Sequence, residues 1–368
     1  MKRFLTLILL VLSSAAFAKT IPVTDPNIYF SPYTWKTVKS GGDTAREAVL
    51  PGAYIKASFK GTSSLGLVID AAASKDMTEQ VPVIEYSVDG KPFKTALLSK
   101  DGNVYTLPMA DNLSDGVHTA VIYLKTSYLW SNRYTSARSH LIVKGFETED
   151  NGVTAEQSVR PKTIIGYGDS ITEGVAVDGY LKLSNWDNLA VNNARCSWLP
   201  IVAAALDCEY GQVGVSAIGF TKGEDDWPLF QQSWDRYDAY ESRLVKGRFD
   251  PEPDYIMLSM GTNDKFNDVF TAAYAGWMKK VRIAAPNAVL VLIVPPSGSH
   301  RDQINKAVEA SSDDNIILID TPETNEQVHL RAGAATGMAY DALHPNMYGQ
   351  AVYAAGIAAR LSKALEAR

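Results

Sequence analysis

The segment Ile164-Ile165-Gly166-Tyr167-Gly168-Asp169-Ser170-Ile171-Thr172-Glu173-Gly174 decides the fold of this chain. Its apolar first half predicts a buried strand, and the glycine and aspartate that follow predict a turn into the next helix. Ser170 would then lie at the carboxyl end of a strand, where open α/β sheets hold their ligands and reactive groups. The triplet alone is weak evidence, because serine also caps helices.

Two distant motifs follow in an order that strengthens this interpretation. Gly261-Thr262-Asn263-Asp264 follows an apolar strand pattern, and Asp341-Ala342-Leu343-His344-Pro345 precedes the last predicted helix. A serine needs a base to remove its proton, and the base needs a group that orients it. We therefore predict Ser170 as the nucleophile, His344 as the base and Asp341 as its orienting carboxylate. The alternative for Asp341 is a turn residue.

An oxyanion site would need hydrogen-bond donors close to the nucleophile. The backbone N–H of Ser170 and the side-chain amide of Asn263 are two candidates. A third is the backbone N–H of Ala217, in the loop after the second strand, provided that its φ is negative. The alternatives in that loop are Gly214 and Gly219. We expect Asp169 to support the turn before Ser170, and Asp264 to orient Asn263.

These motifs together resemble the SGNH, or GDSL-type, serine hydrolases. The resemblance implies a flavodoxin-like α/β domain with a parallel sheet. The resembled family usually has glycine at the position that aligns with Ala217, so the third oxyanion donor stays open among the residues of that loop.

Two kinds of pattern divide the rest of the chain. Residues 19–157 carry short strand patterns separated by turn residues, and Asp89-Gly90 is a hairpin signal. They predict a β-sandwich or jelly roll. Residues 158–368 alternate apolar strands with helical stretches, which predicts helices on both faces of a parallel sheet. We interpret residues 222–248 as an insertion over the site, with plain packing of a long connection as the alternative.

The predicted elements can be stated by residue number. Strands are expected at 54–59, 65–69, 83–88, 104–107, 118–125, 141–147, 163–166, 209–215, 255–259, 289–294 and 316–319. Helices are expected at 196–206, 269–283, 301–310 and 347–367.

The β half extends the resemblance beyond the hydrolase motifs. Its supporting segments are Phe59-Lys60-Gly61-Thr62-Ser63, Val88-Asp89-Gly90, Asp115-Gly116-Val117-His118-Thr119 and Lys144-Gly145-Phe146. With the motifs above, they are similar to carbohydrate esterase family 2, the two-domain acetyl esterases. This resemblance implies deacetylation of an acetylated polysaccharide or oligosaccharide without a metal or other cofactor. Trp227 and Trp234 could then stack on sugar rings, with core packing as the alternative.

The N-terminus has the pattern of a cleaved signal peptide over residues 1–18. Lys2 and Arg3 precede an apolar run, and Ala16-Phe17-Ala18 is a small-residue cleavage site. The run is too short to span a bilayer stably, and no cysteine for lipid attachment adjoins the cleavage site. We therefore predict a secreted or periplasmic protein without a membrane anchor.

The charge and the cysteine content of the chain exclude some classes of binding partner and cofactor. The formal net charge of −6 becomes −8 without Lys2 and Arg3, which disfavours nucleic-acid binding and suits a neutral substrate. Cys196 and Cys208 flank a predicted helix, whose rise of about 1.5 Å per residue separates them too far for a disulfide. No His/Cys cluster has the spacing of a zinc site.

Two other functions remain open. One is a lipid or aryl esterase of the same fold, which a mostly apolar acyl groove would favour. The other is a carbohydrate-binding protein with an inert hydrolase half, which the presence of Ser170, Asn263 and His344 disfavours. The sequence gives no indication of the oligomeric state.

Overall fold

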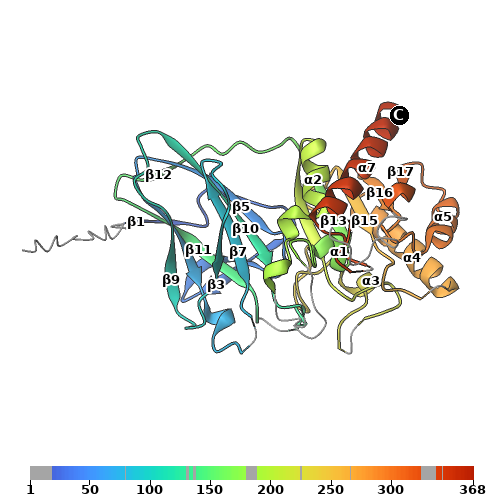
Figure 1. Ribbon diagram of the computed structural model, residues 1–368, viewed down its shortest axis with the longest axis horizontal. Coiled ribbons are helices and arrows are strands. Elements are labelled where there is room, and N and C mark those ends of the chain that lie inside the picture. The colour runs from blue at the N-terminus through green and yellow to red at the C-terminus, as the bar shows by residue number, and fades with distance from the viewer. Residues whose placement is uncertain are drawn as a thin grey trace, which may run out of the picture.

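The computed structural model describes residues 19–78, 80–129, 132–135, 138–179, 189–223, 226–265, 267–324, 337–341 and 343–368. The predicted signal peptide lies outside these residues. Within them, an all-β half and an α/β half lie side by side along the long axis of the molecule (Figure 1). None of the helices in these ranges is long and apolar enough to span a bilayer.

The β half is a sandwich of two antiparallel sheets, as predicted. The first sheet has the order β3-β4-β11-β6-β9, with β1 also paired to β11. Its strands are β1 (Lys19–Pro22), β3 (Trp35–Ser40), β4 (Asp43–Ala48), β6 (Leu65–Asp70), β9 (Val104–Ala110) and β11 (Leu141–Thr148). The second has the order β12-β5-β10-β7-β8, with β2 also paired to β5. Its strands are β2 (Tyr29–Phe30), β5 (Tyr54–Lys60), β7 (Val83–Val88), β8 (Lys94–Leu97), β10 (Val117–Thr126) and β12 (Val153–Ala155).

The second sheet of the sandwich is covered on both faces. Alternate side chains of a strand point to opposite faces, and Ile55 and Ile84 enter the sandwich core. Their neighbours Tyr54 and Glu85 are also buried, because they point toward the α/β half. β5 and β7 therefore carry a second buried face, which forms the junction between the halves.

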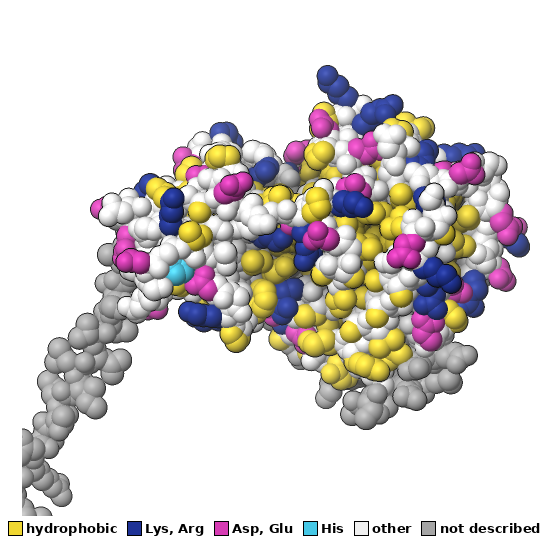
Figure 2. Space-filling model, turned by 90° about the horizontal axis from the view of Figure 1, so that it is seen from above, with side chains coloured by type: hydrophobic (Ala, Val, Ile, Leu, Met, Phe, Trp, Pro, Cys, Tyr) yellow, Lys and Arg dark blue, Asp and Glu magenta, His cyan; other side chains and the backbone are white. Residues whose placement is uncertain are grey.

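Glu209 is the central polar group of that junction. It is 1% exposed and accepts hydrogen bonds from the Tyr54 hydroxyl and from Lys56 Nζ at 2.6 and 2.8 Å. Burial alone would raise the pKa of Glu209, but the hydrogen bonds from Lys56 and Tyr54 bring it below its usual value. Viewed from above, charged and hydrophobic side chains lie together where the halves meet (Figure 2).

The α/β half contains a five-stranded parallel sheet in the order β14-β13-β15-β16-β17. Its strands are β13 (Lys162–Gly168), β14 (Cys208–Gly214), β15 (Tyr255–Ser259), β16 (Val289–Ile293) and β17 (Ile316–Ile319). Numbered within this half, the order is 2-1-3-4-5, the flavodoxin-like arrangement that the family resemblance implies. Such sheets bind ligands where the strand order reverses, beyond the carboxyl ends of β13 and β15.

Helices cover both faces of this sheet. The helices are α1 (Ser170–Glu173), α2 (Trp198–Ala205), α3 (Phe230–Ser233), α4 (Asp268–Ala284), α5 (Arg301–Glu309) and α7 (Met347–Glu366). On one face, Ile165 and Leu258 pack with α4 residues such as Trp277. On the other, Ile164 and Met257 pack with α2 and α7. Cys196 and Cys208, on either side of α2, are free thiols as predicted.

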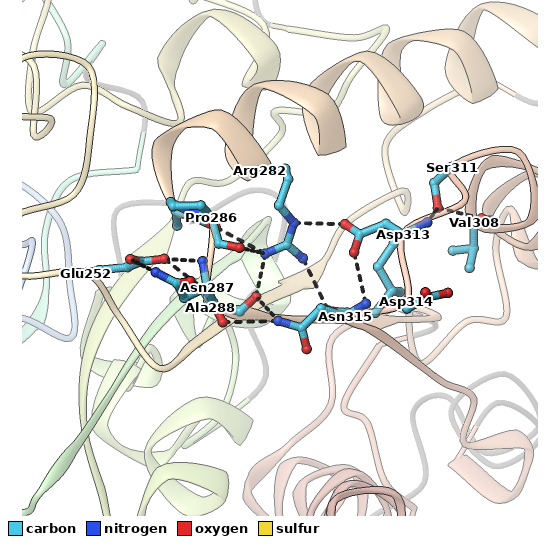
Figure 3. Close-up of polar contacts among 12 residues, drawn as sticks. Glu252, Arg282, Pro286, Asn287, Ala288, Val308, Ser311, Asp313, Asp314 and Asn315 are labelled. Carbon is cyan, nitrogen blue, oxygen red and sulfur yellow. Dashed lines mark hydrogen bonds and ion pairs between the residues drawn. The ribbon is translucent and has the colours of Figure 1, made fainter. Parts of the chain in front are cut away.

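The amino ends of β16 and β17 are fastened to the end of α4 by one arginine (Figure 3). Arg282 Nε donates to Asp313 Oδ2 at 2.9 Å. Its Nη1 donates to the Ala288 carbonyl at 2.7 Å, and its Nη2 to the Asn315 carbonyl at 3.2 Å. One planar guanidinium thus satisfies backbone carbonyls of two loops that lie far apart in the sequence.

We expect Arg282→Met to lower the free energy of unfolding by about 2 kcal/mol, because the charge-assisted hydrogen bonds to Asp313 and to the backbone carbonyls are lost. Urea denaturation checks this value, with Lys279→Met, an exposed position on the same helix, as the control. A wild-type unfolding midpoint for Arg282→Met would contradict the assignment.

Candidate active site

Ser170 starts α1 immediately after β13, at the carboxyl edge of the sheet. Asp169 caps this short helix, because its Oδ1 accepts from the Ile171 N–H at 3.0 Å, and Gly174 ends it with a φ of 84°. The turn is too tight for a side chain at Gly168, where a Cβ would lie 1.9 Å from Thr172 Oγ1. The strand and the cap therefore hold Ser170 in one position, and Asp169 supports the turn as expected.

His344 and Asp341 reach Ser170 from the loop before α7. His344 Nε2 lies 2.9 Å from Ser170 Oγ, and His344 Nδ1 lies 2.8 Å from Asp341 Oδ2. Asp341 Oδ1 also accepts from the backbone N–H of His344 at 2.6 Å, which holds the loop in shape. The structure thus brings together the three residues that the sequence singles out. In this geometry the imidazole can take the hydroxyl proton of Ser170.

Two carboxyl groups beside the serine differ in their environment. Burial opposes ionisation of Asp341, but the hydrogen bonds and charge of His344 lower the pKa of Asp341 below its usual value. For Asp169, burial outweighs its hydrogen bonds and the charge of His344, and it raises the pKa of Asp169 to about 6. Asp341 is therefore the carboxylate that stays ionised beside the imidazole.

The Ser170 and His344 side chains open into a cavity of about 210 Å³. Ala217 and Asn263 line it on the side of the loops after β14 and β15, so the predicted oxyanion donors share one cavity with the serine. Asn263 Nδ2 also donates to the Ile218 carbonyl at 3.1 Å, which fixes the orientation of its amide.

Ala217 has a φ of 62°, so the condition of a negative φ is not met. Its N–H is kept as a candidate donor because Ala217 lines the cavity together with Ser170 and Asn263. The left-handed region favours glycine, which accounts for the glycine that the resembled family usually has there. The alternatives in the loop are constrained by their neighbours. The Gly219 N–H donates to the Lys222 carbonyl at 2.7 Å, and a Cβ on Gly214 would lie 2.4 Å from the Glu173 nitrogen.

Asp264 does not orient Asn263, contrary to expectation. Its Oδ1 accepts from the backbone N–H and the hydroxyl of Thr221, the latter at 2.8 Å. It therefore anchors the far end of the β14 loop.

The two tryptophans proposed to contact sugar differ in position. Trp227 lines the cavity, and it also lines a neighbouring hollow with Tyr134 and Arg236. Trp234 is 4% exposed and packs in the core, with its ring 6.5 Å from that of Tyr167. A buried ring has no face for a sugar, so the expectation for Trp234 is wrong and core packing is its role.

Two residues that shape the site were not predicted from the sequence. Leu129, from the loop after β10 in the β half, lines the cavity and packs against Val175. Glu173 accepts hydrogen bonds from Ser216, next to Ala217. Glu173 lies three residues after Ser170, which is a usable sequence signal. Leu129 offers none, because only the fold brings its loop to the serine.

No group of three or more His, Cys, Asp or Glu side chains in the described ranges is arranged to hold a metal ion.

Several solved carbohydrate esterases share this two-part fold. A family two carbohydrate esterase from Cellvibrio japonicus has a TM-score of 0.74 at 17% identity, over 95% of this chain and 98% of that one. An acetyl xylan esterase from Butyrivibrio proteoclasticus has a TM-score of 0.72 at 14% identity, over 95% and 98%. A family two carbohydrate esterase from Clostridium thermocellum, solved with cellohexaose, has a TM-score of 0.69 at 18% identity, over 92% and 99%. At these identities the likeness shows the fold.

Sequence comparison with curated proteins gives no match, but a family-level comparison does. The GDSL-like Lipase/Acylhydrolase family matches residues 167–352, just over half of the chain. The matched region begins in β13 before Ser170 and ends in α7 after His344, so it includes every residue of the hydrogen-bonded chain described above. The protein therefore belongs to the GDSL-like lipase/acylhydrolase family and is a carboxylic ester hydrolase.

Proposed function

We propose that this protein is a secreted serine esterase that removes O-acetyl groups from acetylated polysaccharides or oligosaccharides through an acyl-enzyme. The observation that carries the proposal is the hydrogen-bonded chain Asp341–His344–Ser170 at the edge of a small cavity. Secretion is inferred from the signal pattern in residues 1–18.

In the first half-reaction, Ser170 Oγ attacks the acetyl carbonyl while His344 Nε2 takes its proton. The tetrahedral intermediate collapses when the imidazolium returns that proton to the sugar oxygen, which leaves as the free hydroxyl. In the second half-reaction, His344 activates water, which attacks the acyl-enzyme and releases acetate. Asp341 holds the imidazole in the required tautomer and stabilises its charged form in both steps.

The negative charge of each intermediate falls on the former carbonyl oxygen. The Ser170 and Ala217 N–H groups and the Asn263 amide are the proposed donors to this oxygen. Donors that are already oriented need no rearrangement as the charge develops, and one of them can contribute about 3 kcal/mol to transition-state stabilisation.

The shape of the cavity supports a small acyl group. Leu129, Val175 and Leu343 form apolar lining around the serine, and Leu129 and Val175 are almost fully buried. A volume of about 210 Å³ lies below the range of pockets that enclose drug-sized ligands, about 300–1,000 Å³. Trp227, at the same cavity, offers a ring for a sugar face.

The same apolar lining favours a second candidate, a short-chain lipid or aryl esterase. The two functions differ in the alcohol that leaves. A sugar would stack on the ring of Trp227, whereas an aryl or lipid alcohol would not need a sugar-binding ring at the entrance.

We expect Ser170→Ala to abolish acetate release and His344→Ala to remove nearly all of it. Asp341→Asn should cost about 10²-fold to 10⁴-fold in kcat, because it only orients and stabilises the ring. Assays on nitrophenyl acetate and acetylated xylan check this, with folding verified by circular dichroism. A serine-directed fluorophosphonate should label the wild type but not Ser170→Ala. Full activity in Ser170→Ala would refute the serine mechanism. A wild type that releases acetate from no ester would instead support the carbohydrate-binding alternative.

The small size of the cavity should limit the length of the acyl group that the enzyme accepts. We expect kcat/KM on nitrophenyl esters to be highest for acetate and to fall for butanoate and octanoate. Leu129→Ala should raise the octanoate-to-acetate ratio, because it removes part of the wall. Leu97→Ala, at a surface position 58% exposed, is the control. A maximum at octanoate in the wild type would support the lipid esterase instead.

The left-handed backbone at Ala217 gives a third test. Ala217→Gly should keep activity and equal or exceed the wild type in melting temperature, because glycine adopts this conformation freely. Ala217→Val should lower the free energy of unfolding by about 1–2 kcal/mol and lower kcat as well. Equal melting temperatures and rates for the glycine and valine variants would show that the conformation is not maintained in solution.

A further inference from the structure

We propose that Arg133 of the β half positions the oxyanion loop of the α/β half, acting through Glu173. The inference rests on the proposed function, and it makes the β-sandwich a working part of the active site. Arg133 and Glu173 are positioning residues in this scheme, since neither one lines the cavity that holds the serine.

The contacts form a continuous path. Arg133 lies in the segment between β10 and β11, and its Nη2 lies 2.5 Å from Glu173 Oε1. Glu173 Oε2 accepts from the Ser216 backbone N–H at 2.8 Å and from the Ser216 hydroxyl at 2.6 Å. Ser216 immediately precedes Ala217, the proposed oxyanion donor. One carboxylate therefore joins the β half to the loop that stabilises the developing charge.

Burial makes this path rigid. The Arg133 and Glu173 side chains are each 1% exposed, so water cannot replace either partner. Removing one member of such a pair leaves an unpaired charge in the interior, which is strongly unfavourable. Because Glu173 ends α1, the same short helix that starts with Ser170, the carboxylate also fixes the loop relative to the nucleophile.

The backbone of the loop shows why it needs this support. Ala217 adopts a φ of 62°. This conformation is unfavourable for any residue that has a Cβ atom, and it persists only when the surrounding structure enforces it. The hydrogen bonds to Ser216 act on the adjacent residue. Gly214, three residues before Ala217, packs so closely on Glu173 that a Cβ there would lie 2.4 Å from its backbone nitrogen.

The same segment of the β half contributes to the cavity itself. Leu129 lies four residues before Arg133, and it lines the cavity with Ser170 and His344. One segment thus supplies an apolar wall to the acyl site and a charge to the oxyanion loop. The position of the β half relative to the sheet should therefore affect the rate of the chemical step.

The test compares four full-length variants: Arg133→Met, Glu173→Gln, the double variant Arg133→Met/Glu173→Gln, and the control Lys56→Met. Lys56 pairs with the buried Glu209 across the same junction but does not contact the oxyanion loop. Melting temperature, kcat and KM for nitrophenyl acetate are measured for each, with Ser170→Ala in the same assay.

We expect Arg133→Met to lower kcat by about tenfold to a hundredfold with little change in KM, because misplaced donors affect the transition state. The double variant should have a higher melting temperature than Arg133→Met, since the unpaired charge of Glu173 is gone. Its kcat should stay as low as that of Arg133→Met. Lys56→Met should have a lower melting temperature than the wild type but the same kcat. An ion pair with a purely structural role would not lower kcat independently of the melting temperature.

The opposite results overturn the inference. They are a folded Arg133→Met enzyme with wild-type kcat, a double variant that recovers kcat together with stability, or a Lys56→Met enzyme that loses kcat to the same extent. If Ser170→Ala turns over the ester as well as the wild type does, the proposed function itself fails. If Ser170→Ala is inactive and Arg133→Met has wild-type kcat, only the positioning role fails.

Discussion

The burial of β13 in the parallel sheet is the constraint on which the site depends. Hydrogen bonds to β14 on one side and β15 on the other leave this strand no freedom of register. Its carboxyl end therefore delivers Ser170 to a fixed point, and the ends of the neighbouring strands deliver the loops of Ala217 and Asn263 to the same edge. His344 is the exception, since it comes from the loop before α7, and Asp341 stabilises that loop as well as the imidazole.

Buried carboxylates organise the junction between the two halves. Glu209 and Glu173 lie in the α/β half and are paired with Lys56 and Arg133 from the β half. Such pairs contribute little net stability, because desolvation offsets their attraction. They do penalise any other arrangement, since separating the halves would leave charges without partners. The junction thus specifies geometry more than it adds stability, which suits an interface that carries residues of the cavity.

Elements with strong internal patterns could be predicted from the sequence, and elements defined by tertiary contacts could not. The strands expected at 83–88, 255–259 and 316–319 match β7, β15 and β17 in full, because they are apolar and bounded by turns. β1, β2, β3, β4, β8 and β12 were missed. Of these, β3, β8 and β12 are edge strands with partly exposed side chains. The motifs located Ser170, His344 and Asp341, whereas Trp234 shows that an aromatic residue in an insertion does not reveal which way its ring faces. Leu129 and Arg133 depend on how the two halves pack, which no local pattern encodes.

Ala217 connects these observations. A glycine in its place would adopt the left-handed conformation without support, but it would also leave the loop more freedom. An alanine restricts the loop, at a conformational cost that neighbouring contacts must offset. Glu173 supplies contacts on one side of Ala217, and Asp264 anchors Thr221 on the other. Because the charge of Glu173 is in turn balanced by the β half, the backbone conformation of one residue in the catalytic half depends on the packing of a separate sandwich. A chain of this family with alanine at that position would therefore tolerate loss of its β half less well than one with glycine.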